Sequence, residues 1–125
     1  MSGGLIAIID DDDAVREALQ QLVRSLGYSV ATFGSAEAFL KSEQITNTSC
    51  LITDLQMPGL SGLDLQDRLI AKGHRIPIVF LTGDPDESLR ARALKAGAIA
   101  FLSKPCNDDH LLGSLEKALR TDDPA

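Results

Sequence analysis

Three acids, a threonine and a lysine lie where this sequence changes from apolar to polar. Asp10 and Asp11 follow the first apolar run of the chain, and Asp54 follows the third. Thr82 ends the fourth run, and Lys104 comes directly after the fifth. Three carboxylates held close together repel one another, which implies a cation, and oxygen ligands of this kind suit Mg²⁺. A lysine charge and a hydroxyl donor opposite them would suit a phosphoryl group, with an aspartate available to carry it.

The hydrophobic pattern predicts five short strands that alternate with five helices. The expected strands cover residues 5–9, 28–33, 50–54, 76–82 and 99–103, and the expected helices lie at about 15–26, 35–41, 61–72, 84–96 and 111–119. The polar residues 42–49 are expected to form a loop. Asp84 is expected to cap the fourth helix, with Pro85 at its first position.

Near-continuous apolar strands that alternate with helices indicate a parallel sheet covered on both faces. We therefore expect an α/β fold: a doubly wound, flavodoxin-like sheet of five parallel strands, flanked by five helices. In the strand order 2-1-3-4-5, the first and third strands are neighbours, and their carboxyl ends meet at the switch point where such folds bind ligands. This order would bring Asp10, Asp11 and Asp54 together.

Composition and charge limit the function further. The 125 residues fit one domain, expected over residues 1–121, with 122–125 as a tail or the start of a linker. The net charge of -6 argues against direct nucleic-acid binding, which depends on Lys and Arg contacts to phosphates. No apolar run is long enough to cross a membrane, and the first residues lack the features of a signal peptide, so we expect a cytoplasmic protein without membrane contact.

Several short motifs follow one another in a specific order along the chain. They are Asp10-Asp11, Asp54 with Met57-Pro58-Gly59 and Ser61-Gly62, Thr82-Gly83, and Lys104-Pro105. In this order and at these intervals, the sequence resembles the receiver domains of two-component response regulators. The resemblance extends from Ile6 to about Leu119, and the stretches 35–40 and 51–62 resemble receivers of the FixJ-like class.

This resemblance implies a role for each acid of the site. Asp54 would accept a phosphoryl group from the phosphohistidine of a sensor histidine kinase. Asp11 would bind Mg²⁺ directly and Asp10 mainly through water. Asp54 and the backbone carbonyl of Gln56 would complete the protein ligands, and Lys104 would pair with the phosphoryl oxygens.

The resemblance also implies a switch and a set of partners. Thr82 would turn toward the phosphoryl group, and Phe101 would move inward with it. The fourth helix, fifth strand and fifth helix would then dock an output domain, a partner or a second receiver as a homodimer, and the output would be control of transcription. The domain would act on no external substrate, apart from its own phosphotransfer and dephosphorylation.

Three alternatives share parts of this pattern. Phosphatases of the haloacid-dehalogenase type also use an aspartate after an apolar strand with Mg²⁺, but they need a second acid two residues later, where this chain has Gln56. A flavodoxin would need a Ser/Thr-rich phosphate loop after the first strand. A receiver-like interaction module that works without phosphorylation stays open, because only reactivity distinguishes it.

Overall fold

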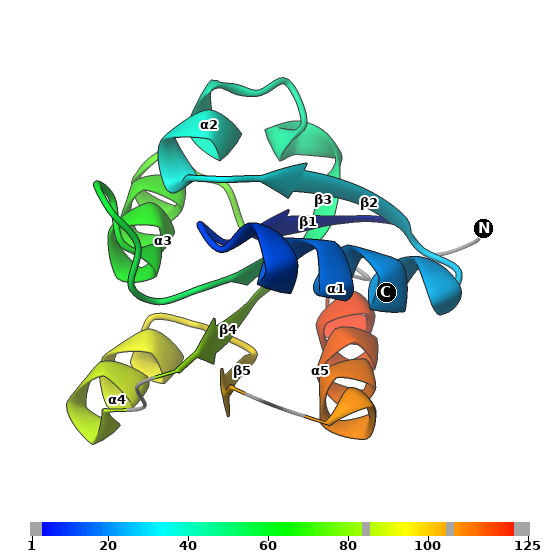
Figure 1. Ribbon diagram of the computed structural model, residues 1–125. Coiled ribbons are helices and arrows are strands. Elements are labelled where there is room, and N and C mark those ends of the chain that lie inside the picture. The colour runs from blue at the N-terminus through cyan, green and yellow to red at the C-terminus, as the bar shows by residue number, and fades with distance from the viewer. Residues whose placement is uncertain (1–3, 84–85, 105–106, 122–125) are drawn as a thin grey trace.

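The chain folds into one five-stranded parallel sheet with helices on both faces (Figure 1). The computed structural model describes residues 4–83, 86–104 and 107–121. Along the chain the elements are β1 (Leu5–Ile9), α1 (Asp13–Ser25), β2 (Ser29–Phe33), α2 (Ala36–Lys41), the 3₁₀ helix η1 (Ile45–Asn47), β3 (Thr48–Thr53), α3 (Gly62–Ala71), β4 (Ile78–Thr82), α4 (Glu87–Lys95), β5 (Ala100–Ser103) and α5 (Asp108–Thr121). The strand order is β2-β1-β3-β4-β5, which confirms the predicted fold.

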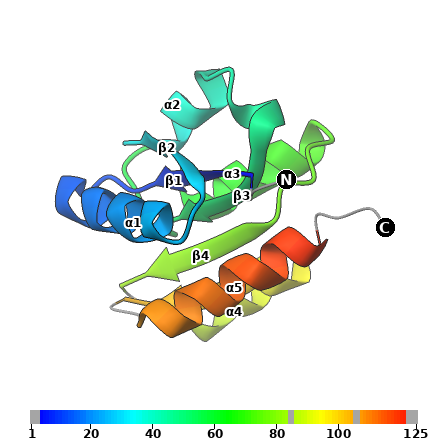
Figure 2. The same cartoon turned by 90° about the vertical axis from the view of Figure 1, so that its right-hand side faces the viewer.

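Two apolar clusters, one on each face of the sheet, hold the layers together. On one face Phe39 of α2 and Leu65 of α3 pack with Phe80 of β4, and all three side chains are fully buried. On the other face Val23 of α1 and Leu115 of α5 pack against the sheet. Figure 2 is viewed from this second side, so that α5 lies in front of α4. Because both faces are covered, the central strands are apolar at almost every position.

The strand register determines where the acids lie. Ile9, the last residue of β1, pairs with Phe33 of β2 and with Thr53 of β3. The next residue of each chain segment continues this ladder: Asp10 N–H donates to the Phe33 carbonyl at 3.2 Å, and Asp54 N–H donates to the Ile9 carbonyl at 3.1 Å. Asp10 and Asp54 are therefore fixed side by side at the carboxyl edge of the sheet.

The start of β3 differs from the prediction. Residues 42–49 are not simply a loop, because they include η1, and β3 begins at Thr48. The Thr48 side chain is buried, and its hydroxyl donates to the carbonyl of Gln44 at 2.7 Å. A threonine whose hydroxyl is bonded in this way fits a buried strand position, although the hydropathy pattern there is polar.

The predicted cap of α4 was wrong. Asp86 caps this helix, and its carboxylate accepts from the N–H groups of Ser88 and Leu89. Asp86 suits the position because its backbone is extended while its side chain reaches the second and third helical N–H groups. Asp84 and Pro85 lie outside the described residues, as do Pro105 and the expected tail 122–125.

Smaller differences occur at the other strand starts. β4 begins at Ile78 rather than at residue 76, because Pro77 has no N–H to donate and contributes only its carbonyl, which accepts from Leu51 N–H at 2.9 Å. β2 and β5 each begin one residue later than expected. Among the described helices, none combines the length and the hydropathy that a membrane crossing requires.

Candidate phosphoryl and cation site

Asp10, Asp11 and Asp54 form one acidic cluster at the carboxyl edge of the sheet. Each offers a carboxylate oxygen, and these oxygens all lie within 4.8 Å of one another. Asp10 is buried, Asp54 is half-buried and Asp11 is exposed, so the cluster opens to solvent on one side. The structure thus brings together the three acids that the sequence placed in one crevice.

Lys104 bridges two of these carboxylates. Its ammonium lies 2.9 Å from Asp10 Oδ2 and 3.0 Å from Asp54 Oδ2. Burial lowers the pKa of Lys104, but the hydrogen bonds and charges of Asp10 and Asp54 outweigh this effect and raise the pKa above its usual value. The side chain is therefore a fixed positive charge, and its partners are only 2% and 12% exposed, so solvent screens the pairs weakly.

Local turns fix the second oxygen of each carboxylate. Asp10 Oδ1 accepts from the N–H of Asp12 at 2.9 Å, and Asp54 Oδ1 accepts from the N–H of Gln56 at 3.2 Å. Arg16 of α1 donates to the backbone carbonyl of Asp10 at 2.6 Å. Asp12 caps α1 through the N–H groups of Ala14 and Val15, as expected for an acid at a helix start.

Thr82 and Phe101 occupy neighbouring strands beside the acids. Thr82 ends β4 and is buried, and its carbonyl accepts from Lys104 N–H at 2.7 Å. This bond ties the end of β4 to the lysine that pairs with Asp54. Phe101 is half-buried on β5, and its ring centroid lies 6.3 Å from that of Phe80. The switching roles of Thr82 and Phe101 stay predictions.

The turn after Asp54 contains contacts that sequence reasoning missed. Gly62 N–H donates to the Leu55 carbonyl at 2.8 Å and closes the turn, and Glu37 of α2 accepts from Leu60 N–H at 3.1 Å. The Glu37 contact joins residues 23 positions apart, and no local spacing rule indicates such a pair. For Arg16, the three-residue spacing to Asp13 indicates their ion pair, but not the bond to the Asp10 carbonyl.

The donor set fits a divalent cation with a preference for oxygen. Three carboxylates converge, and only one positive side chain contacts them among the described residues. Mg²⁺ binds through one or two carboxylates and keeps several waters, and the exposed side of the cluster at Asp11 leaves room for them. Asp10, Asp11 and Asp54 are the side chains that could hold it.

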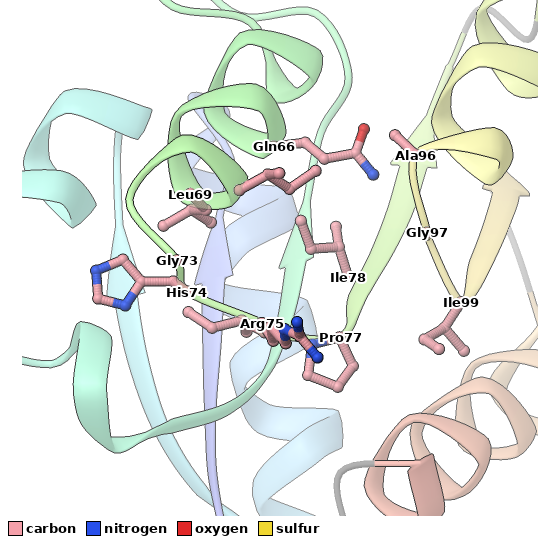
Figure 3. Close-up of a pocket in the computed structure, with 12 residues that line it drawn as sticks. Gln66, Leu69, Gly73, His74, Arg75, Pro77, Ile78, Ala96, Gly97 and Ile99 are labelled. Atoms are coloured by element: carbon pink, nitrogen blue, oxygen red, sulfur yellow. The ribbon is translucent and has the colours of Figure 1, made fainter.

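A pocket of ≈ 490 Å³ lies at the opposite edge of the sheet (Figure 3). It is lined by the end of α3, the segment leading into β4 and the segment between α4 and β5, including Leu69, Pro77 and Ile99. Gln66 donates to the Ala93 carbonyl at 3.2 Å, and its buried Oε1 atom has no hydrogen-bond partner among the described residues. The lining includes His74 and Arg75 but no acid, so this pocket has no carboxylates like those of the carboxyl edge.

A second hollow, between α1 and α5, adjoins the acidic cluster. Its volume is ≈ 810 Å³, and its lining includes Val15, Ala18 and Leu22 of α1, Leu111 of α5, and Lys104. The hollow is mostly apolar and ends at the lysine that contacts Asp54. An apolar surface that runs into a charged site suits a protein partner that delivers its reactive group there.

A doubly wound sheet with an acidic cluster at its switch point defines a class of α/β proteins that bind charged ligands at this edge. Comparison with known proteins narrows the class. Residues 6–116 match the model of the response regulator receiver domain. The chain therefore belongs to the response regulator receiver domain family.

Individual relatives agree with this assignment. The response regulator protein TodT of Pseudomonas putida is 47% identical over 116 residues, which are 93% of this chain and 51% of TodT. The transcriptional regulatory protein FixJ of Bradyrhizobium diazoefficiens is 41% identical over 122 residues, covering 98% of this chain and 60% of FixJ. The crystal structure of FixJ-N superimposes with a TM-score of 0.85 at 34% identity, with 96% of both chains covered. The chain spans about half the length of TodT.

Proposed function

We propose that this chain receives a phosphoryl group on Asp54 from the phosphohistidine of a sensor histidine kinase. The observation that carries the proposal is the pairing of Lys104 with Asp54 inside the cluster of three acids. A half-buried carboxylate with a fixed ammonium beside it and two further acids to hold a cation is suited to phosphoryl transfer.

In the proposed reaction the Asp54 carboxylate attacks phosphorus, the P–N bond of the donor breaks, and the histidine nitrogen keeps the electron pair. The product is an acyl phosphate on Asp54. Lys104, now shared between Asp10 and Asp54, pairs with a phosphoryl oxygen as the new charge arrives. The Asp10, Asp11 and Asp54 carboxylates and the Gln56 carbonyl would hold Mg²⁺, which would supply positive charge to neutralise the phosphoryl group.

Labelling with a small phosphodonor tests this proposal. In the presence of Mg²⁺ and acetyl phosphate, intact-mass measurement should show one added phosphoryl group on the wild-type chain, and none on Asp54→Asn, because the amide is a poor nucleophile. The matched control is Asp109→Asn, which removes an exposed acid from the first turn of α5 and should label like the wild type. Equal labelling of Asp54→Asn would show that another residue accepts the group.

Two further assays separate the proposal from two rival functions. A phosphatase of the aspartate type would release phosphate steadily from a phosphomonoester such as p-nitrophenyl phosphate. The position two residues after Asp54 is Gln56, whose side chain is exposed and is no acid. An interaction module that works without phosphorylation would bind its partner equally well with and without acetyl phosphate. We expect instead no steady turnover of the phosphomonoester, and partner binding that depends on phosphorylation.

Phosphorylation would act through Thr82 and Phe101. Thr82 already shares a backbone hydrogen bond with Lys104, so a phosphoryl group that draws Lys104 closer also acts on the end of β4. Phe101 is next to Phe80 and only half-buried, so an inward move would bury more of its ring. The shift in population is limited by the difference in affinity of the two conformers for the phosphoryl group.

The surface formed by α4, β5 and α5 is the proposed homodimer interface. β5 is an edge strand with half-exposed Leu102, flanked by exposed cations on α4, such as Arg90 and Lys95, and exposed acids on α5, such as Asp109 and Glu116. A second copy offers the complementary charges, since a twofold axis brings α4 of one copy near α5 of the other. We place the chain in the cytoplasm, where it would encounter both the kinase and a second copy of itself.

Sedimentation velocity tests the homodimer. Adding Mg²⁺ with beryllium fluoride, a stand-in for the phosphoryl group, should shift the chain from monomer to dimer. Lys95→Glu should lower the dimer fraction because it removes an opposite-charge contact, and labelling of Asp54 should be unchanged. A chain that stays monomeric at high micromolar concentration in both conditions would contradict the homodimer.

A further inference from the structure

Glu37 joins α2 to the turn that follows Asp54. Its carboxylate Oε2 accepts from the backbone N–H of Leu60 at 3.1 Å. Gly59, the preceding residue, has a φ of 78°, and a Cβ atom there would clash with the same Oε2 atom. The turn therefore runs directly against the carboxylate. Glycine is needed at position 59 both for the positive φ and for this close approach.

Stability alone does not explain this carboxylate. Its second oxygen, Oε1, is buried and has no hydrogen-bond partner among the described residues. A buried polar atom without a partner costs free energy, which an apolar side chain would avoid. Hydrogen bonds from its own backbone N–H and from Leu60 N–H lower the pKa of Glu37, with smaller help from the charges of Arg68 and Lys41. The side chain is thus held as an anion.

The turn connects the Glu37 contact at Leu60 with the site at Asp54. Its other end carries Gln56, whose N–H donates to Asp54 Oδ1 at 3.2 Å. The turn is closed by the bond from Gly62 N–H to the Leu55 carbonyl, but this bond lies at its base and leaves residues 56–60 to be fixed by other contacts. Among the described residues, the Glu37 carboxylate is the side chain that hydrogen-bonds to the backbone of 56–60 from another element.

We propose that Glu37 is a positioning residue for phosphoryl transfer, because it fixes the 56–60 turn and so orients the Gln56 backbone toward Asp54 and the cation. This inference rests on the proposed function of Asp54. Glu37 contacts neither the phosphoryl group nor the cation. Its effect runs through Leu60 and Gln56, as outer contacts orient the ligands of other metal sites.

Labelling rates at varied Mg²⁺ concentration test the inference. For Glu37→Ala, the Mg²⁺ concentration for half-maximal labelling by acetyl phosphate should rise about tenfold. Glu37→Gln, which keeps an acceptor oxygen for Leu60 N–H, should restore most of the wild-type dependence. Glu43→Ala is the matched control, since it removes one exposed carboxylate just after α2 and should leave the curve unchanged.

Amide chemical shifts distinguish positioning from a general loss of structure. In Glu37→Ala, the signals of Gln56 and Leu60 should move, while those of buried Val23 and Leu115 on the other face should not. A Mg²⁺ curve for Glu37→Ala equal to that of Glu43→Ala, or a Glu37→Gln variant as impaired as Glu37→Ala, would overturn the inference. Absence of labelling in the wild type would instead overturn the proposed function itself.

Discussion

Lys104 is the residue on which the charge balance of the site depends. One ammonium serves both Asp10 and Asp54, at 2.9 and 3.0 Å, while Asp11 has no such partner in the described ion pairs. The lysine therefore competes with any cation for the same two carboxylates. Lys104 should therefore have two opposite effects: it should weaken cation binding at these carboxylates and strengthen the attraction of a phosphoryl group.

Replacing Lys104 with methionine should separate these two effects. Labelling of Lys104→Met by acetyl phosphate should slow by at least about tenfold, because the ammonium that would pair with the transferred phosphoryl group is lost. Mg²⁺ should bind more tightly, because Asp10 and Asp54 no longer share an ammonium. Isothermal titration calorimetry measures the second effect, and Lys95→Met, on exposed α4, is the control. Weaker Mg²⁺ binding by Lys104→Met would contradict the competition.

At the residue scale the sequence predicts the acids better than it predicts their supports. Asp10, Asp11, Asp54, Thr82 and Lys104 each end or follow an apolar run, and the topology of a parallel sheet brings such positions to one edge. Glu37 belongs to no such pattern. Its role depends on how α2 packs beside the turn after β3, which only the three-dimensional structure defines.

At the scale of elements, the junction of β3 and α3 is the most tightly built part of the site. Ser61 caps α3, and Ser61 and Asp64 satisfy each other's backbone N–H groups. Gly62, the first residue of the helix, is buried against the segment that carries Asp54. A Cβ atom there would lie 2.5 Å from the Asp54 carbonyl oxygen and 2.9 Å from Phe80 Cε1. The helix can approach the strand only because this position lacks a side chain.

Two glycine-to-alanine variants should change stability in opposite directions. Gly62→Ala should lower the free energy of unfolding by about 1–3 kcal/mol, because the added methyl group overpacks a backbone contact. Gly113→Ala, in the interior of α5 with open space around it, should raise it by about 0.5–1 kcal/mol. Urea denaturation measures both. A stabilised Gly62→Ala would show that the junction has room, and its labelling should then be normal.

Element boundaries show where sequence patterns stop being informative. The five apolar runs predict five strands, since water-excluded strands need apolar residues on both faces. The start of β3 at Thr48 depends on a hydroxyl bonded to Gln44, and the cap of α4 depends on which of two nearby aspartates meets the free N–H groups. Both features are decided by side-chain hydrogen bonds that hydropathy does not register.

At the scale of the molecule, the carboxyl edge of the sheet offers two different surfaces to partners. The hollow between α1 and α5 is apolar and reaches Lys104, whereas the opposite side of β5 is bordered by the charged helix α4. In the proposed reaction a phosphodonor would have to reach Asp54, so its docking surface would have to be continuous with the acidic cluster. The hollow lined by Val15, Ala18 and Leu22 meets this requirement.

Ala18→Arg tests whether a kinase uses this hollow. Ala18 is exposed on α1, so an arginine should change stability little while it fills the hollow and adds a charge to an apolar contact. We expect transfer from a phosphorylated histidine kinase that labels the wild type to slow by about tenfold or more, as for a disrupted interface centre. Labelling by acetyl phosphate should be unchanged, because that donor is small enough to bypass the surface.

The matched control places the same arginine on another helix. Ala91→Arg, at an exposed position of α4, should leave both donors' rates at the wild-type level. A slower rate with both donors for Ala18→Arg would point to damage at Asp54 itself, since Lys104 borders the same hollow. An unchanged rate with the kinase would exclude the hollow as its docking surface. The two donors thus separate the chemistry of the acidic cluster from the recognition that brings a phosphohistidine to it.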